Sequence, residues 1–533
     1  MEVLAPTQEK SREDELLVII EDLKAALAQR DETIRCAELK LDVLQQMLFG
    51  RRSERLATDD KDLQRRLFNE AESEAPTEGD QPADEGVQAA TTKKKKNPGS
   101  GRRRPAGSLE RVEIIHDLDP EDSACPWCNS PRPKIGEERT EEIEVIPAKV
   151  IVKVHVRAKH GPCGCDDFSG HDEKAVITAP GPARIAPGSL FSNNTAAFII
   201  VNKFADGLPF HRQESVLGRM GLDMARGTMA RLAIRVSNEL EPLFNRMLRD
   251  VRGSPVLGMD ETVLQVLKEI GRKPSSESRM WVARGFAGDD TQGPVIWFEY
   301  ADSRSGDVAA SIISDFKGYL QTDGYAGYTR LGRRLGVEHV GCWAHVRREF
   351  HQLYRSDEKS PLARQILHLI GRLYTTERSL RALFDNGTLN IEGFMAQRKA
   401  ETLPVFEAIL DWLHKNEPEV PPQSPMGKAI SYALGQYRRA IRYVEHWLLT
   451  PDNNPVENAI RPFVIGRKNW LFNDTPRGAK ASARLYSLIE TAKANGHEPF
   501  KYLCHLFATL PIATDKHAAA ASLLPYNLKP GSY

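Results

Sequence analysis

The sequence predicts a multidomain protein of the mixed α+β class, and three observations support this prediction. The chain has 533 residues, more than a single compact core usually organises. Apolar residues recur every seven positions near the N-terminus, which predicts a coiled coil. Beyond residue 250, short β-rich runs that end in acidic residues alternate with helical patterns, as in an α/β core.

The composition is that of an ordinary globular protein, with 41% hydrophobic and 27% charged residues. No apolar run reaches the roughly 18 residues that span a bilayer, and the polar N-terminus does not resemble a signal peptide. These features predict a cytoplasmic protein without a membrane partner. The seven cysteines are too few and too unevenly spaced for a disulfide framework, and their clustering favours metal binding.

Residues 1–56 are expected to form the coiled coil. Two interleaved apolar series make a seam for a partner helix. They consist of Ile20, Leu27, Ile34, Leu41 and Leu48, and of Leu16, Leu23 and Leu44. A helix packed on its own domain would show the same pattern. We favour a homo-oligomer because a charged linker follows and offers no nearby core; the oligomer number does not follow from the pattern.

Residues 57–110 form an expected flexible linker with two opposite charge blocks. The formal net charge of the chain is zero, from 73 basic and 73 acidic residues. Acidic residues nevertheless concentrate in 70–85 and basic residues in 93–104. Separate blocks cancel in the sum but not in space, so the zero net charge does not exclude a nucleic-acid partner. A solvated linker without a partner explains the blocks as well.

Residues 111–180 contain two close cysteine pairs that suit a structural zinc site. The pairs are Cys125 with Cys128 and Cys163 with Cys165. Four thiolates can complete a tetrahedral Zn²⁺ site and staple a segment too small to fold alone. The β-branched stretch at 143–156 predicts strands between the pairs. A histidine can replace one cysteine, and unpaired surface thiols are the alternative. The candidate histidines are His155, His160 and His171.

Residues 181–250 predict a helix-turn-helix region. The expected helices cover residues 192–204, 210–220 and 226–240. A turn at Gly221 separates the last two helices. The third helix has an apolar face and an opposite polar face that carries Arg231 and Arg235. A doubly basic face on the second helix of such a pair suits the major groove of DNA, whereas plain scaffolding is the alternative.

Residues 251–346 predict the first part of a catalytic core. Three β-rich runs are followed by a helix and a fourth β-rich run, which is the order of a ribonuclease-H-like fold. The runs cover residues 254–260, 279–286, 294–300 and 318–323, and the helix covers 306–316. The first and fourth strands of that fold lie side by side, so Asp260 and Asp323 at their ends should come together.

A third acid, Glu457, falls in the expected final part of the core, residues 441–490. Asn454 is a suitable N-cap and Pro455 a suitable first helical residue, so Glu457 should lie in the opening turn of a helix. Three carboxylates suit hard divalent ions, Mg²⁺ or Mn²⁺ rather than Zn²⁺. Two such ions stabilise the attacking and leaving oxygens of phosphodiester transfer.

Residues 347–440 predict a helical insertion between the second and third acids, and residues 491–533 a C-terminal segment. Amphipathic faces occur at 362–373 and 432–447. Such an insertion can shield the active site or grip DNA, and the sequence does not choose between these roles.

Cys342 and His345 lie three residues apart after an expected strand. His345 can approach a scissile phosphate; the alternative, which we favour slightly, is a buried cysteine with a packed histidine. Basic side chains near the acids are candidate contacts to DNA phosphates, with surface solvation as the alternative for each. They are Arg347, Arg348, Arg461, Arg467 and Lys468. Trp470 beside them is expected in the core rather than stacked on a base.

Six segments of the chain resemble the DDE transposases of the bacterial insertion sequence 66 family. They are residues 48–54, the Cys125/Cys128 knuckle, and residues 259–262, 322–325, 341–345 and 453–462. The segments follow the family order over nearly the whole chain, and the last is the most specific. The resemblance implies a leucine zipper, a zinc-binding segment, a helix-turn-helix and a ribonuclease-H-like core with a helical insertion.

The same resemblance carries over to single residues. Asp260, Asp323 and Glu457 match the catalytic triad of the family position by position. Cys342 and His345 resemble a C-x-x-H pair that several DDE transposases carry near the second acid. The spacing of the second cysteine pair, Cys163 and Cys165, departs from the pattern of the family, whereas Cys125 and Cys128 match it.

These observations predict a DNA transposase that cleaves the ends of its insertion sequence and joins the 3′-hydroxyls to target DNA. Its expected partners are DNA and accessory proteins encoded by the same element, and its expected location is the bacterial cytoplasm, associated with the nucleoid. Two alternatives remain open. One is a non-catalytic DNA-binding repressor or domesticated transposase, and the other is a ribonuclease-H-like nuclease that cuts without joining.

Overall fold

The computed structural model describes residues 30, 149–160, 177–287, 293–356 and 360–533. The expected coiled coil apart from Arg30, the expected charged linker and the two cysteine pairs of the expected zinc site lie outside these residues. Within the described ranges, no helix has both the length and the apolar composition needed to cross a membrane.

The strands expected at 143–156 do not form in the part of this stretch that the structure describes. Residues 149–158 have no regular secondary structure, and Val152 is 89% exposed. β-Branched side chains favour strands when they pack on a pleated, half-buried surface, and this stretch stays exposed. The nearest strands are β1 (Lys159–His160) and β2 (Ile177–Thr178), which form a short antiparallel pair.

Three helices form where the sequence predicts them. They are α5 (Asn193–Phe204), α6 (Phe210–Arg219) and α7 (Arg226–Glu239). The side chain of Ser192 caps α5 by accepting a hydrogen bond from the backbone N–H of Thr195. Gly221, with φ of 83°, makes the turn between α6 and α7, a conformation that favours glycine. α8 (Glu241–Arg252) follows directly.

The central sheet has five strands in the order β5-β4-β3-β6-β7. The strands are β3 (Val256–Gln265), β4 (Glu277–Phe286), β5 (Pro294–Ala301), β6 (Gly318–Gln321) and β7 (Val337–Val340). β3, β4 and β5 are antiparallel neighbours, whereas β3, β6 and β7 run parallel. The pairing of β3 with β6 confirms that the first and fourth strands of this region are neighbours.

The apolar run at 254–260 suggested that the first strand ends at Asp260, but β3 extends further. It continues to Gln265 because β4 pairs with it over this length, with Asp260 opposite Val282. β6 ends at Gln321, two residues before Asp323. Short helices connect these strands. They are α9 (Gly306–Ile313) before β6, and α10 (Ala326–Thr329) and the 3₁₀ turn η2 (Leu331–Arg333) between β6 and β7.

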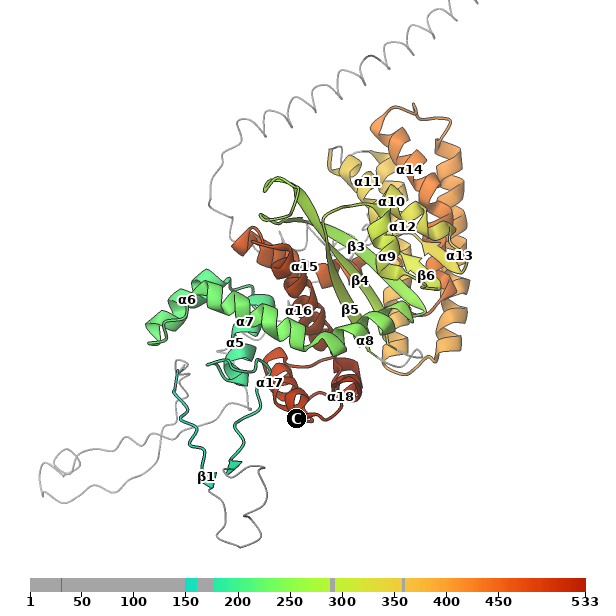
Figure 1. Cartoon of the computed structure of the whole chain (residues 1–533). Coiled ribbons are helices and arrows are strands. Elements are labelled where there is room, and N and C mark those ends of the chain that lie inside the picture. Colours follow the sequence, from blue (N-terminus) through green and yellow to red (C-terminus); the bar gives the residue numbers. More distant parts are fainter. Residues whose placement is uncertain (1–29, 31–148, 161–176, 288–292, 357–359) are drawn as a thin grey trace, which may run out of the picture.

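The helices of the insertion gather on one side of the sheet (Figure 1). They are α11 (Trp343–Ser356), α12 (Pro361–Asp385), α13 (Ile391–Asn416) and α14 (Pro425–Ala440). Their facing sides bury a hydrophobic cluster that includes Trp343, Phe406 and Tyr443. The amphipathic face expected at 362–373 is confirmed, because Ile366, Ile370 and Leu373 are buried.

The segment expected as one amphipathic stretch at 432–447 is not a single helix. α14 ends at Ala440, and the 3₁₀ turn η3 (Ile441–Glu445) follows. The backbone N–H of Gly341 donates a hydrogen bond to the carbonyl of Arg439, in the last turn of α14, at 3.0 Å. The guanidinium of Arg398 in α13 donates hydrogen bonds to the carbonyls of Tyr443 and His446, which a continuing α-helix would need for its own hydrogen bonds.

The C-terminal helices lie on the side of the sheet opposite the insertion (Figure 1). They are α15 (Asn454–Trp470), α16 (Pro476–Ala494), α17 (Pro499–Thr509), η4 (Leu510–Ile512), α18 (Lys516–Ser522) and η5 (Pro525–Asn527). α16 covers the edge strand β5. Ser487 and Thr491 accept hydrogen bonds from the backbone N–H groups of Phe298 and Ile296 at 2.8 and 3.0 Å, so the edge is closed to further pairing.

The helices α5 to α8, the sheet and the C-terminal helices share one hydrophobic core. Its buried residues extend from Ile185 to Leu524. The amide of Asn193 at the start of α5 donates a hydrogen bond to the carbonyl of Phe507 in α17 at 2.7 Å. The expected helix-turn-helix region is therefore packed against α17.

Candidate functional site

The pairing of β3 with β6 brings Asp260 and Asp323 to adjacent positions. Gly258 lies opposite Gln321 in the parallel register, and each acid follows two residues later. Neighbouring strands lie about 4.8 Å apart, so the two side chains start from neighbouring backbone positions. Oδ1 of Asp323 accepts a hydrogen bond from the backbone N–H of Tyr325 at 3.0 Å.

Glu457 reaches the same place because α15 packs closely on β3. A Cβ atom at Gly258 would lie 2.3 Å from Cγ2 of Val456 and 3.1 Å from Oδ1 of Asn453. The bare backbone at Gly258 therefore admits the first turn of α15, which carries Glu457. Asn453 fixes this joint, because its Nδ2 donates a hydrogen bond to the carbonyl of Met259 at 2.9 Å.

The helix that carries Glu457 begins one residue earlier than the sequence suggested. Asn453, rather than Asn454, is its N-cap, and the side chain of Asn453 makes no capping hydrogen bond because it binds the strand instead. Asp452 satisfies this end of the helix. Its Oδ1 and Oδ2 accept hydrogen bonds from the backbone N–H and Nδ2 of Asn454 at 3.0 and 2.8 Å. Glu457 lies in the opening turn, as expected.

The three acids are close enough to perturb one another. Burial raises the pKa of Asp260 well above its ordinary value, and nearby negative charges, first that of Glu457, raise it further. Burial and the charge of Asp323 raise the pKa of Glu457, although Arg348 and Arg461 act in the opposite direction. The neighbouring negative charges disfavour the charged forms of Asp260 and Glu457. A divalent cation would relieve this repulsion.

Glu261 follows Asp260 in β3 but has other partners. The guanidinium of Arg304 donates to Oε1 of Glu261 at 2.6 Å, and the hydroxyl of Tyr328 donates to Oε2 at 2.6 Å. Arg304 also stacks on the ring of Tyr325, at 3.9 Å from its centroid. Because both oxygens of Glu261 are engaged, Asp260 is the better cation ligand of the two adjacent acids.

Cys342 and His345 border the acid cluster. They lie between the end of β7 and the first turn of α11, with Nδ1 of His345 3.2 Å from Sγ of Cys342. The backbone N–H of Asn453 donates to the same sulfur at 3.3 Å. Burial raises the pKa of the Cys342 thiol well above its usual range, and burial followed by Arg348 lowers the pKa of His345 to about 4. Both groups are therefore neutral near pH 7.

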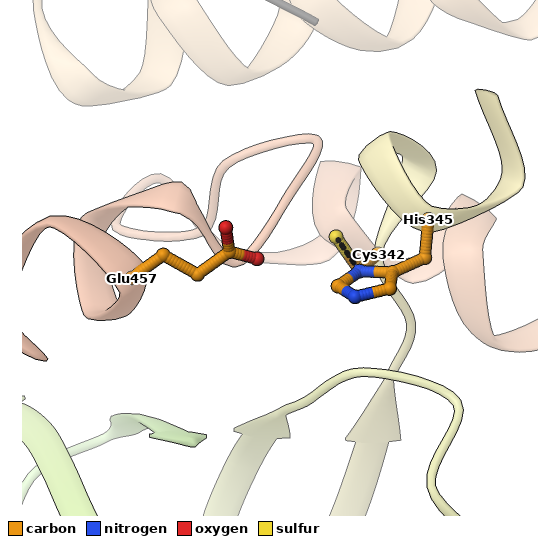
Figure 2. A group of neighbouring side chains, drawn as sticks. All are labelled: Cys342, His345 and Glu457. Atoms are coloured by element: carbon orange, nitrogen blue, oxygen red, sulfur yellow. Dashed lines mark hydrogen bonds between the residues drawn. The ribbon is translucent and has the colours of Figure 1, made fainter. Parts of the chain in front are cut away.

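The Cys342–His345 pair also reaches Glu457. Sγ, an imidazole nitrogen and a carboxylate oxygen of the three residues lie within 4.8 Å of one another (Figure 2). Cys342 is 3% exposed, as a packed cysteine would be, whereas His345 is half-buried. The sequence indicated this pair. Its proximity to Glu457 depends on the position of α15 and was not predicted.

The candidate DNA contacts differ in exposure. Arg231 and Arg235 are exposed on α7, opposite its buried face. Lys468 is exposed, whereas three of the candidate arginines are half-buried. These are Arg348, Arg461 and Arg467. Arg347 is only 5% exposed, so it does not present its guanidinium to solvent and does not suit the phosphate contact expected of it.

Lys203 is a residue of this region that the sequence did not indicate. Its ammonium lies 4.3 Å from the ring centroid of Trp470 and 4.5 Å from that of Phe210. Burial lowers the pKa of Lys203 to about 8. Trp470, expected in the core, is half-buried and also packs against Tyr486. These contacts join α5 and α6 to the end of α15. Because the residues are distant in sequence, the local pattern did not predict the contacts.

Four family models match the chain. The transposase IS66 family model matches residues 188–481, and the IS66 C-terminal element matches residues 487–526. The zinc-finger binding domain of transposase IS66 matches residues 122–166, which include both cysteine pairs. A model described as the transposase C of IS166 homeodomain matches residues 37–114, from within the expected coiled coil through the expected linker. These matches support a structural zinc and DNA as a partner.

Uncharacterized proteins of Sinorhizobium fredii are similar to the chain over most of its length. The protein y4jD is 30% identical over 432 residues, which cover 79% of this chain and 81% of that protein. The protein y4qI is 30% identical over 520 residues, which cover 95% and 92%. Together with the family models, which extend from residue 37 to residue 526, these similarities show that the chain belongs to the IS66 family of transposases.

Proposed function

We propose that this transposase uses Asp260, Asp323 and Glu457 as a DDE triad to cleave the ends of its insertion sequence and join the 3′-hydroxyls to target DNA. The observation that carries the proposal is the convergence of the three acids from two adjacent parallel strands and one helix end into a mutually repelling group. The sheet order also supports a ribonuclease-H-like core, with three antiparallel strands followed by two parallel strands.

The acid cluster fits divalent metal ions. Asp260, Asp323 and Glu457 would hold Mg²⁺ or Mn²⁺, because these ions prefer carboxylate oxygens. Bound ions of this kind stabilise the charge on the attacking and leaving oxygens of phosphodiester transfer. Burial and the charges of neighbouring acids raise the pKa of Asp260 and Glu457, and this supports the assignment, because a bound cation would stabilise the charged carboxylates.

Other side chains of the site would position the DNA. Arg348 and Arg461 lie near enough to Glu457 to act on its charge, so they place positive charge beside the position of a scissile phosphate. His345 is neutral near pH 7 because its pKa is lowered to about 4, and it can hydrogen-bond to a phosphate oxygen or to the attacking group. The exposed face of α7 with Arg231 and Arg235 would bind the element end.

The remaining modules complete the proposal. Cys125, Cys128, Cys163 and Cys165 would hold the structural Zn²⁺ within the matched zinc-finger region. Residues 1–56 would join copies of the chain through a coiled coil. The protein would act in the bacterial cytoplasm at the nucleoid, together with accessory proteins of the same element.

A strand-transfer assay separates the candidate functions. It uses the full-length chain, DNA carrying the element ends, a target plasmid and Mg²⁺. A transposase yields joined products, a ribonuclease-H-like nuclease cuts without joining, and a non-catalytic repressor or domesticated transposase binds the ends without cutting. The assembly of all three acids favours a catalytic protein over a repressor. Cutting that is never followed by joining would replace our proposal with the nuclease.

Gly258→Ala is expected to slow strand transfer by about a hundredfold, because a displacement of about 1 Å at a reacting group has an effect of this size. The new methyl group would meet Cγ2 of Val456 and push the first turn of α15, with Glu457, away from Asp260. Val456→Ala in the same chain removes the clashing methyl groups and should restore part of the rate. Equal losses in the single and double variants would show that Val456 is not the obstacle.

Arg231→Ala and Arg235→Ala are expected to weaken binding of the element ends and to reduce its salt dependence. Each lost phosphate contact lowers the slope of log affinity against log salt concentration by about 0.9. Gel-shift titrations at several salt concentrations measure the slope. Arg249→Ala, an exposed arginine on α8, is the matched control. Unchanged slopes in both α7 variants would favour the scaffolding role for this helix.

A further inference from the structure

Cys342, His345 and Glu457 offer sulfur, nitrogen and oxygen donors within 4.8 Å of one another. Figure 2 shows the carboxylate of Glu457 pointing from α15 toward the other two side chains. We propose that these three residues bind a thiophilic divalent cation, of which Zn²⁺ is the physiological example, and that this ion competes with magnesium for Glu457. The competition rests on the proposed function of Glu457 as a magnesium ligand, whereas the binding does not.

The distances suit a zinc site. Nδ1 of His345 and Sγ of Cys342 are 3.2 Å apart. Zn–S bonds of about 2.3 Å and Zn–N bonds of about 2.0 Å at a tetrahedral angle separate the two ligand atoms by about 3.5 Å. The pair therefore needs an adjustment of only a few tenths of an ångström, roughly a tenth of their separation. Glu457 closes the remaining gap by rotation of its flexible side chain.

The donor set and its charge select zinc over magnesium. Thiolate and imidazole ligands favour zinc, whereas magnesium prefers oxygen ligands in an octahedral arrangement. Binding releases the proton of the Cys342 thiol to solvent, and the thiolate and the Glu457 carboxylate then neutralise the two positive charges of the ion. The backbone N–H of Asn453, which donates to Sγ of Cys342 at 3.3 Å, supports the thiolate as outer partners of metal ligands do.

Because Glu457 would serve both sites, bound zinc would inhibit strand transfer. Cys342 and His345 belong to the start of α11, whereas Asp260 belongs to β3, so the carboxylate of Glu457 lies between two sets of partners. A zinc ion held on the α11 side would draw Glu457 away from Asp260. The same side chain would then be lost to the magnesium site. Strand transfer would stop until zinc is removed or magnesium is raised.

A cobalt titration of the full-length chain tests the binding. Co²⁺ occupies zinc sites, and its tetrahedral thiolate complexes absorb in the near ultraviolet by charge transfer and in the visible range by d–d transitions. We expect the wild type to bind one more Co²⁺ per chain than Cys342→Ser and His345→Asn, with the cysteines of the zinc-finger region intact in all chains. Cys504→Ser, the other cysteine in the described part of the chain, is the matched control and should equal the wild type. Equal stoichiometry and spectra in wild type and Cys342→Ser would overturn the proposal.

Inhibition of strand transfer tests the competition. Free Zn²⁺ is buffered at increasing concentrations while Mg²⁺ is fixed. We expect zinc to inhibit the wild type, more Mg²⁺ to relieve this inhibition, and Cys342→Ser to need at least a tenfold higher zinc concentration for the same effect. Inhibition that is equal in both chains would overturn the competition. If the chain joins no DNA under any condition, the proposed function fails, and the cobalt titration still decides whether the cation binds.

Discussion

Asp260→Asn and Glu457→Gln are each expected to slow strand transfer by about a thousandfold or more, which corresponds to about 4 kcal/mol of lost transition-state stabilisation. Each replacement keeps the size of the side chain and removes the negative charge that would hold a cation. Binding of the element ends should persist, because Arg231 and Arg235 lie on α7. Joined product measured against time at saturating Mg²⁺, with gel shifts of the same chains, checks both expectations.

Asp260→Asn should also stabilise the metal-free protein. Burial and nearby acids raise the pKa of Asp260, so the folded protein keeps a proton that the unfolded chain releases near its ordinary pKa of about 3.9. The stability that this proton contributes is present at low pH and is lost as pH rises through the folded pKa. The melting temperature of the wild type should therefore fall below that of Asp260→Asn with increasing pH, and Mg²⁺ should reduce the difference.

Glu490→Gln is the matched control for these acids. Glu490 is 5% exposed on α16, and burial raises its pKa as it does that of Glu457. Its carboxylate pairs with Lys493 at 3.0 Å, so it belongs to no acid cluster. We expect Glu490→Gln to join DNA at the wild-type rate. Full joining by Asp260→Asn or Glu457→Gln, or an equal loss in Glu490→Gln, would contradict the triad.

Arg398→Ala is expected to lower the free energy of unfolding by about 3–5 kcal/mol, the usual effect of breaking a buried ion pair. Arg398 is fully buried. Its guanidinium donates to both oxygens of Glu377, at 2.8 and 2.5 Å. It also donates to the carbonyls of Tyr443, His446 and Leu449 at 3.1, 3.0 and 2.7 Å. Removal leaves these buried carbonyls without this donor and, within the described residues, leaves Glu377 paired with Arg381 alone.

Urea unfolding of purified chains measures this effect. Arg398→Lys keeps the charge but loses the planar fork that serves several acceptors at once, so we expect a smaller but clear loss of stability. Arg372→Ala, on the exposed side of α12, should change the free energy of unfolding by less than about 0.5 kcal/mol. A change below about 1 kcal/mol in Arg398→Ala would show that neighbouring groups replace the guanidinium.

The elements that depend on local chemistry could be predicted from the sequence. Ser192 caps α5 and Gly221 makes the turn after α6, so the helix boundaries followed from nearby residues. The adjacency of Asp260 and Asp323 followed from the order of strands and helix. By contrast, the continuation of β3 beyond Asp260 depends on pairing with β4, and the 3₁₀ turn after α14 is bound by Arg398 from another helix. The local sequence pattern does not predict such contacts between distant elements.

The candidate site shows the same division. Glu457 was placed in an opening helical turn from its neighbours, but its approach to β3 depends on the bare backbone of Gly258. A glycine within a strand run is a known sign of close backbone approach, so this feature had a readable signal. The burial of Arg347 and the reach of His345 to Glu457 depend on contacts between elements distant in sequence, and no local signal indicated them.

The hydrogen bond from Asn193 to Phe507 joins residues 314 positions apart, and this has a consequence for synthesis. A ribosome delivers α5 long before α17, so α5 lacks this partner until α17 has been synthesised. Contacts of such long sequence separation also slow folding. A nascent chain that stops before residue 507 would therefore lack this contact, and α5 would be synthesised without the partner that holds its first turn.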